Sequence, residues 1–147
     1  MTTAIIGYGV VGKAYHKVFE DAVIYDPYQP DYEHVTQEAV NQCDVAIVCV
    51  WTGLTEDGKL DMSIVEDVVS WIETPLIIIK SALYPGTTDK LVAKTGKKIA
   101  VSVEYAGEGN YPVHFWKYPH QTDPRYHQML VVGGSEEAAE EASQVLW

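Results

Sequence analysis

The chain of 147 residues has few cysteines and few basic side chains, and it contains no long apolar run. Cys43 and Cys49 are its only cysteines; on one extended strand they would lie roughly 20 Å apart, too far for a disulfide. Ten Lys and Arg against 21 Asp and Glu give a net charge of −11, which disfavours binding to nucleic acid or to an anionic membrane. The longest apolar run, residues 45–51, is much shorter than the roughly 20 residues of a membrane helix. Reduced thiols and the lack of a basic, apolar leader predict a cytoplasmic protein.

Hydrophobic residues make up 47% of the chain and charged residues 21%, a balance typical of a globular domain with a sizeable core. Short apolar runs alternate with amphipathic stretches, which predicts strands joined by helices in a parallel, doubly wound sheet. The predicted strands are residues 2–6, 22–25, 45–50, 76–79, 99–103 and 129–132. The predicted helices are residues 10–19, 36–42, 63–72, 87–94 and 135–146. We therefore expect residues 1–147 to form one α/β domain of the Rossmann type, with a mostly parallel six-stranded sheet in the order 3-2-1-4-5-6.

A GxGxxG pattern, formed by Gly7, Gly9 and Gly12, lies directly between the first predicted strand and the first predicted helix. In this context the first glycine allows a tight turn, the second lets the backbone approach a pyrophosphate, and the third lets helix and strand pack closely. Val10 and Val11 open the helix, whose N-terminus offers unpaired N–H groups and a partial positive charge to phosphates. The turn therefore predicts a dinucleotide site.

Asp26 follows the second predicted strand, 19 residues after Gly7, where a carboxylate can accept hydrogen bonds from the hydroxyls of a ribose. Its neighbours Tyr25, Pro27 and Tyr28 include no cation that would neutralise a 2′-phosphate. The expected cofactor is therefore NAD rather than NADP.

Three further segments follow the third, fourth and fifth predicted strands, at the edge of the sheet where α/β folds bind ligands. Residues 49–53 and 57–61 read CVWTG and DGKLD, residues 80–88 read KSALYPGTT, and residues 103–109 read VEYAGEG. They resemble CVPTP with DGSxD, KSTVPPGTT and PEFLREG, which occur in that order in the UDP-glucose/GDP-mannose 6-dehydrogenase family. With the Gly-rich turn included, the chain resembles the N-terminal, NAD-binding domain of that family over essentially its whole length.

The resemblance implies an enzyme that oxidises the C6 hydroxyl of a UDP- or GDP-sugar to a carboxylate with NAD. It implies that Val50, Thr52 and Ser81 contact the cofactor. It also implies catalytic roles for Glu104, which would support substrate and water, and for Glu108, which would contact the nicotinamide near the reacting carbon. A carboxylate in such a position can act as a general base. Judged on its own spacing, Thr52 could instead only organise its loop, and that alternative stays open.

Several residues of the family have no counterpart here. Ala82 takes the place of a threonine that helps to hold the catalytic water, and no segment matches the Gly-flanked cysteine nucleophile, the catalytic lysine or the sugar-binding domain. The resemblance therefore implies that a nucleotide-sugar substrate needs a missing C-terminal domain and that this chain alone is inactive. Helix 135–146 ends on apolar residues without a C-cap, which favours the first domain of a longer polypeptide over a helix end that packs back on the sheet.

Residues 110–128 form a long predicted loop rich in aromatic residues and in histidine, including His114, His120 and His127. The spacing of these histidines does not match metal-binding patterns, so no metal is expected. A lid, an intersubunit contact and simple packing over the sheet edge stay open for this loop, and a homodimer is likewise left open. Three other functions also stay open. They are a stand-alone, non-catalytic NAD-binding module, which Ala82 favours, a different NAD-dependent β-hydroxyacid-type dehydrogenase, and a purely structural interaction domain, which the Gly-rich turn and Asp26 disfavour most.

Overall fold

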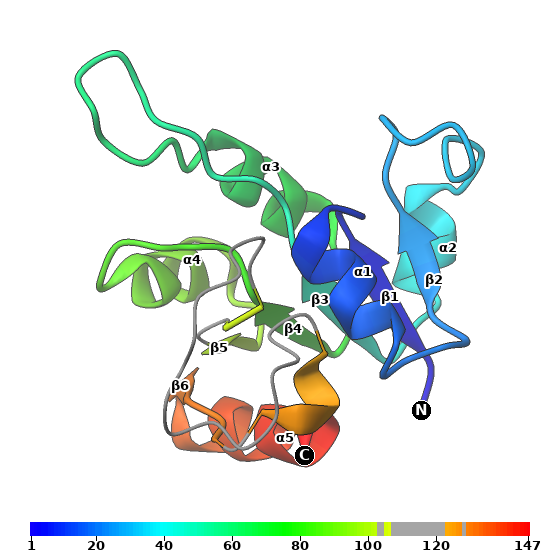
Figure 1. Ribbon diagram of the computed structural model, residues 1–147. Coiled ribbons are helices and arrows are strands. Elements are labelled where there is room, and N and C mark those ends of the chain that lie inside the picture. The colour runs from blue at the N-terminus through cyan, green and yellow to red at the C-terminus, as the bar shows by residue number, and fades with distance from the viewer. Residues whose placement is uncertain (103–104, 107–122, 128) are drawn as a thin grey trace.

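The computed structural model describes residues 1–102, 105–106, 123–127 and 129–147. In this part of the chain, helices cover both faces of a six-stranded sheet (Figure 1). The strands are β1 (Thr3–Ile6), β2 (Val23–Tyr25), β3 (Val45–Val48), β4 (Leu76–Ile79), β5 (Ile99–Ser102) and β6 (Val132–Gly134). The helices are α1 (Val10–His16), α2 (Gln37–Asn41), α3 (Ser63–Trp71), α4 (Thr87–Thr95) and α5 (Glu136–Leu146), with a 3₁₀ turn η1 (Pro124–Tyr126).

The apolar, β-branched runs form the central strands because both faces of the sheet are covered. Every residue of β1, β3 and β4 is buried. Strands β1 to β5 pair in parallel, and β6 pairs antiparallel to β5. The prediction of an α/β fold with a mostly parallel six-stranded sheet is therefore confirmed.

The predicted strand order 3-2-1-4-5-6 is wrong at one end of the sheet, where the observed order is β2-β1-β3-β4-β5-β6. Strand β3 pairs with β1 in the register Ile5↔Ile47, so that β2, not β3, forms the edge. All of β3 is buried, whereas Val23 and Tyr25 of β2 are half-buried. Placing the wholly apolar β3 at the exposed edge would therefore cost more burial free energy than placing β2 there. The observed order is the other common doubly wound arrangement, which reverses direction between β1 and β3.

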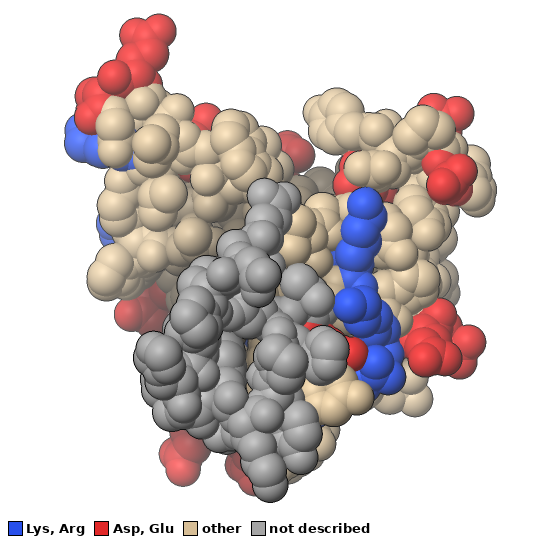
Figure 2. All heavy atoms as spheres, viewed as in Figure 1, with Lys and Arg blue, Asp and Glu red and all other residues tan. Residues whose placement is uncertain are grey.

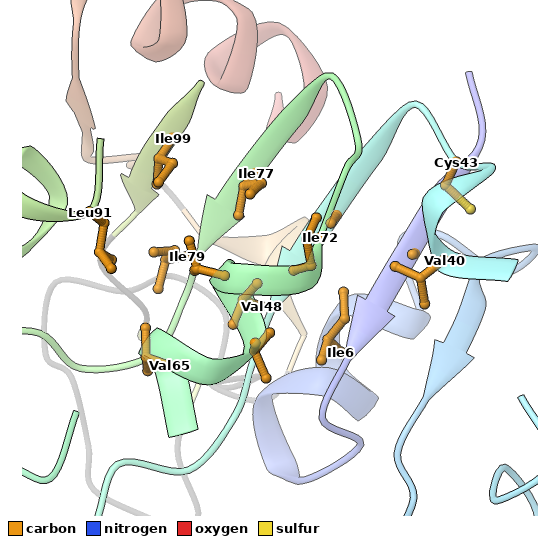
Figure 3. Close-up of a cluster of buried hydrophobic side chains, with 14 residues drawn as sticks. Ile6, Val40, Cys43, Val48, Val65, Ile72, Ile77, Ile79, Leu91 and Ile99 are labelled. Carbon is orange, nitrogen blue, oxygen red and sulfur yellow. The ribbon is translucent and has the colours of Figure 1, made fainter. Parts of the chain in front are cut away.

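Two hydrophobic clusters, one on each face of the sheet, hold the layers together. Helices α2, α3 and α4 cover the face to which Val40 and Leu91 contribute (Figure 3). Helix α1, through Tyr15, and small residues of α5 cover the other face. Side chains alternate along each strand, so β1 sends Ile6 to the first cluster and Ile5 to the second. Helix α1 joins β1 to β2 on one face, whereas α2, α3 and α4 join the following strands on the other face. The face changes because the chain reverses its direction across the sheet after β2 and the connections are right-handed.

The last strand is shifted from its predicted position at residues 129–132. Strand β6 begins at Val132, and Met129 is exposed. The observed strand uses glycine because it approaches β5 closely: a Cβ on Gly134 would lie 3.1 Å from the carbonyl oxygen of Ile99. A prediction based on apolar runs cannot select such a strand, because glycine adds nothing to the apolar pattern.

Both cysteines are free thiols, which confirms the prediction that they form no disulfide. Cys43 is buried, and this burial raises the pKa of its thiol. Cys49 directly follows β3 and borders the cleft described below. None of the helices in the described ranges combines the length and the apolar character that a membrane span needs.

Candidate cofactor-binding site

A cleft of about 1150 Å³ opens at the carboxyl ends of β1, β2, β3 and β4. It lies where the sheet reverses direction between β1 and β3, the position at which doubly wound sheets bind ligands. Most of the predicted cofactor contacts line this cleft, and they come from four separate segments of the chain: Gly7, Gly9, Val10, Val11, Asp26, Val50, Thr52 and Ser81. Gly12 lies behind the cleft, where it has a packing role.

The three glycines of the turn have different structural reasons to be glycine. Gly7 has φ +89°, and a Cβ there would lie 2.8 Å from the carbonyl oxygen of Cys49. A Cβ on Gly12 would lie 2.0 Å from the carbonyl oxygen of Gly7, so α1 packs against the turn at a distance that only glycine permits. A Cβ on Gly9 would meet no atom within 4 Å. The protein fold therefore requires Gly7 and Gly12, whereas Gly9 keeps the backbone open towards the cleft.

The N-terminus of α1 faces the cleft through Gly9, Val10 and Val11. No side chain caps this end, and its first turn contains no acidic residue. The unpaired N–H groups and the positive end of the helix dipole are thus available to an anionic ligand. A narrow stripe of Lys and Arg side chains crosses the region of α1 on a face whose other charged residues are mostly acidic (Figure 2).

Asp26 binds the Gly-rich turn directly, which sequence reasoning did not predict. One carboxylate oxygen accepts a hydrogen bond from the N–H of Tyr8 at 2.8 Å, and the other accepts one from the N–H of Tyr28 at 3.0 Å. The turn is further tied to β2 because the N–H of Gly7 donates to the carbonyl of Tyr25 at 2.9 Å. Each carboxylate oxygen retains lone-pair capacity for a ligand hydroxyl. The predicted ribose acceptor therefore also organises the Gly-rich turn.

The side chain of Tyr8 anchors the outer side of the turn. Its hydroxyl donates to Nδ1 of His16 at 2.6 Å, since His16 Nε2 lies 3.1 Å from the carbonyl of Glu20 and donates to it. Its ring packs edge-on against Tyr32, with 4.8 Å between the ring centroids. Burial and the neighbouring Tyr32 raise the pKa of Tyr8 to about 12, so the phenol stays protonated and can act as the donor. This anchor was not predicted from the sequence.

An apolar slot forms the end of the cleft beside β2. The rings of Tyr25 and Trp71 pack edge-to-face with 5.2 Å between their centroids. Ile64, Val68 and Trp71 lie four and then three residues apart along α3 and line the same end of the cleft. No functional role was predicted from the sequence for these α3 residues. Their helical periodicity is the only sequence feature that could have revealed a shared face.

The other end of the cleft lies over β3 and β4. The hydroxyl of Ser81 donates to the carbonyl of Val50 at 2.7 Å and so joins the segments that follow the two strands. Thr52 is half-buried, and Ala82 is exposed, at the same end. Lys80, which had no predicted role, is buried and lines the cleft here.

The predicted catalytic residues Glu104 and Glu108 lie outside the described residues, as do His114 and His120. Their roles stay predictions. In the ranges that the structure does describe, no three His, Cys, Asp or Glu side chains gather as a metal site would require.

The sheet order, the glycine turn and the position of the cleft define a doubly wound α/β domain of the Rossmann type. The chain belongs to the UDP-glucose/GDP-mannose dehydrogenase family, because the model of that family's NAD binding domain matches residues 29–147. The Gly-rich turn and Asp26 precede the matched segment, so their assignment to the site rests on the geometry described above. A search of curated proteins found no significant match.

Solved structures of similar fold include three dehydrogenases. A UDP-D-ManNAc dehydrogenase from Pyrococcus horikoshii has a TM-score of 0.72 and 23% identity, and the alignment covers 99% of this chain and 44% of that one. A UDP-glucose dehydrogenase from Pyrobaculum islandicum has a TM-score of 0.65 and 21% identity, with coverage of 99% and 43%. A GDP-mannose dehydrogenase from Pseudomonas aeruginosa has a TM-score of 0.62 and 18% identity, with coverage of 99% and 44%. The chain thus spans less than half the length of these proteins.

Proposed function

We propose that this domain binds NAD in the cleft and serves a nucleotide-sugar 6-dehydrogenase, which oxidises the C6 hydroxyl of a UDP- or GDP-sugar to a carboxylate. The observation that carries the proposal is the convergence of the Gly-rich turn, Asp26 and the ends of β3 and β4 on one cleft within a chain of this family. Substrate binding and turnover would need the remaining length that the relatives have, so this chain alone would be inactive.

In the proposed binding mode, the pyrophosphate lies against the N-terminus of α1 and the adenosine lies over β2. Asp26 would accept hydrogen bonds from the ribose hydroxyls, and the slot formed by Tyr25 and Trp71 would hold the adenine. The nicotinamide would then lie over β3 and β4, near Thr52 and Ser81. NAD supplies the hydride acceptor of the reaction. By the family resemblance, Glu104 would support substrate and water, and Glu108 would act beside the nicotinamide.

The proposed preference for NAD over NADP follows from the charge of Asp26. A carboxylate at the ribose would repel a 2′-phosphate. Among the described residues at the β2 end of the cleft, none is Lys or Arg. The fold itself does not select the cofactor. A reductive aminase from Aspergillus terreus, whose structure matches this chain with a TM-score of 0.63, was solved in complex with NADPH.

A calorimetric titration of the chain with NAD and with NADP tests this proposal. We expect saturable binding of NAD and at least about tenfold weaker binding of NADP, because a buried or half-buried charge repulsion costs on the order of 1.4 kcal/mol or more. Absence of binding at millimolar NAD, or a preference for NADP, would contradict the proposal. Formation of NADH by the complete polypeptide with a UDP- or GDP-sugar tests the substrate class.

A second function, a non-catalytic NAD-binding module, is favoured by one observation. Ala82 is exposed at the end of β4 and offers no hydroxyl where the family resemblance expects a threonine. Such a module would bind NAD as described and form no NADH with any nucleotide sugar. The same turnover assay therefore separates the two functions.

Replacing Trp71 with alanine is expected to weaken NAD binding about tenfold. The variant removes an aromatic wall of the adenine slot, and aromatic contacts are worth about 0.5–1.5 kcal/mol beyond the area they bury. The same loss is expected for AMP, which carries only the adenosine end. Trp147→Ala is the matched control, since Trp147 is exposed and lies outside the cleft lining. Equal NAD affinity of wild type and Trp71→Ala would place the adenine elsewhere.

A further inference from the structure

Asp67 is an exposed carboxylate on the helix that forms one wall of the apolar slot. It is the fifth of the nine residues of α3, and it lines the cleft together with Ile64 and Trp71. Aspartate is a weak helix former away from the first turn, because its side chain competes for backbone hydrogen bonds. The hydroxyl of Ser70 donates to the backbone carbonyl of Asp67 at 2.6 Å, but in the part of the chain that the structure describes no group bonds to the carboxylate. Folding therefore gives no reason for an acid at this position.

The spacing of residues along α3 places Asp67 beside the aromatic wall of the slot. Residues three and four apart lie on one face of a helix, so Ile64, Asp67 and Trp71 share a face. The neighbouring face points into the first hydrophobic cluster, to which Val65 and Ile72 belong (Figure 3). Side chains of a helix lean towards its N-terminus, which brings the side chain of Trp71 towards the turn that contains Asp67. A flat base packed against Trp71 would therefore have an edge within reach of the carboxylate.

Two carboxylates line the described part of the cleft, and their surroundings differ. Asp26 accepts hydrogen bonds from the N–H groups of Tyr8 and Tyr28 and so belongs to the Gly-rich turn. Asp67 projects from α3 with both oxygens available to a ligand. The proposed binding mode assigns Asp26 to the ribose and the aromatic slot to the adenine, and the inference rests on that proposed function. In that mode Asp67 lies beside the base.

The group of adenine that an acid can recognise is its exocyclic amine. This amine donates hydrogen bonds, whereas guanine and hypoxanthine carry a carbonyl oxygen at the same position. A carboxylate only accepts hydrogen bonds, so it attracts the amine and repels the carbonyl. Gln29 and Gln37 also line the cleft, but an amide can turn and present either its donor or its acceptor. A carboxylate can therefore distinguish the two kinds of purine where an amide cannot.

We infer that Asp67 selects an adenine dinucleotide by accepting a hydrogen bond from the exocyclic amine of the base. An analogue with a carbonyl at that position loses this bond and places two acceptors opposite each other. A site that hydrogen-bonds its ligand rejects such an analogue more strongly than an apolar pocket rejects a change of size. A GDP-sugar also carries a purine and a pyrophosphate, so this selection keeps a guanine nucleotide substrate out of the cofactor cleft.

The test measures the dissociation constants of NAD and of nicotinamide hypoxanthine dinucleotide for the 147-residue chain by calorimetric titration. The analogue has a carbonyl in place of the adenine amine and is otherwise the same dinucleotide. Wild type is expected to bind NAD at least about tenfold more tightly, because a hydrogen bond to a charged acceptor is lost in the analogue. Asp67→Asn keeps the size of the side chain but can donate to the carbonyl. It is expected to bring the two affinities within about threefold of each other.

Two comparisons separate recognition of the base from a general effect of charge. Gln37→Ala is the matched control, since Gln37 lines the cleft from α2, the helix that packs against β2, and it should retain the wild-type preference for NAD over the analogue. NAD and NADP carry the same base, so Asp67→Asn should weaken both equally. If Asp67→Asn changed the preference between NAD and NADP and left the preference between NAD and the analogue unchanged, Asp67 would act on the phosphate and the inference would be wrong.

The remaining outcomes are also decisive. Equal affinity of wild type for NAD and the analogue would overturn the inference and leave NAD binding itself intact. A preference that survives in Asp67→Asn would overturn it as well, because another group would then recognise the amine. If wild type binds neither dinucleotide, the proposed function fails, and this inference fails with it. If thermal unfolding shows that Asp67→Asn does not fold, Asp67→Ser replaces it, since a hydroxyl can likewise donate or accept, and the same ratio of affinities decides.

Discussion

Replacing Gly12 with alanine is expected to lower the melting temperature by about 10 °C and to abolish NAD binding. The new Cβ would lie 2.0 Å from the carbonyl oxygen of Gly7 and 3.4 Å from Cγ2 of Ile5. The first clash is with backbone, which cannot rotate away, so α1 must move off β1. Overpacking of this kind costs about 3 kcal/mol, and in a domain of this size each kcal/mol lowers the melting temperature by roughly 2–4 °C. Thermal unfolding followed by titration with NAD measures both effects.

The matched control is Gly9→Ala, the same substitution at another glycine of the same turn. Gly9 has φ −78°, which alanine adopts freely, and a Cβ there meets no atom within 4 Å. The melting temperature should therefore stay within about 1 °C of wild type. NAD binding should still weaken by at least about tenfold, because the methyl group occupies the space through which the pyrophosphate approaches the backbone.

A wild-type melting temperature for Gly12→Ala would contradict the helix packing described here.

Replacing Asp26 with alanine is expected to weaken NAD binding about 100-fold. The carboxylate accepts N–H hydrogen bonds from Tyr8 and Tyr28, so its loss would release the Gly-rich turn. It would also remove the proposed contact with the ribose. Hydrogen bonds to a charged group are worth about 1.5–3 kcal/mol each, and every 1.4 kcal/mol is a tenfold change in affinity. Calorimetric titration of the variant with NAD, after a check that it unfolds at a temperature close to that of wild type, measures the loss.

The affinity for NADP separates the two roles of Asp26. Removing the carboxylate weakens the turn for both cofactors, but it also removes a charge that repels the 2′-phosphate. NADP binding should therefore fall much less than NAD binding, and the preference between the cofactors should nearly vanish. Asp67→Ala is the control, since Asp67 is an exposed carboxylate that lines the same cleft from α3. If Asp67→Ala and Asp26→Ala changed the preference equally, general charge in the cleft, not the ribose contact, would select NAD.

The candidate site was predictable where its residues form a local pattern. Gly7, Gly9 and Gly12 are set by the geometry of one turn, and Asp26 by its distance along the chain from that turn. Three residues that the family motifs pointed to also line the cleft: Val50, Thr52 and Ser81. Trp71 carries no such pattern, because it belongs to a helix whose apolar residues are equally consistent with a core position. Lys80 lies in one of the family motifs, but no role was predicted for it.

The sequence by itself determined the α/β class, the alternation of strands and helices and the family, because turn geometry and the periodicity of apolar residues depend on near neighbours. Only the tertiary structure decided that β3 lies beside β1 and that β6 includes Gly134, since both depend on which residues distant in sequence pack together. The contacts of Asp26 with Tyr8, of Lys80 with Tyr15 and of Tyr25 with Trp71 are of the same kind. Each joins segments whose separation along the chain is unrelated to their distance in space, and only the folded sheet brings them together.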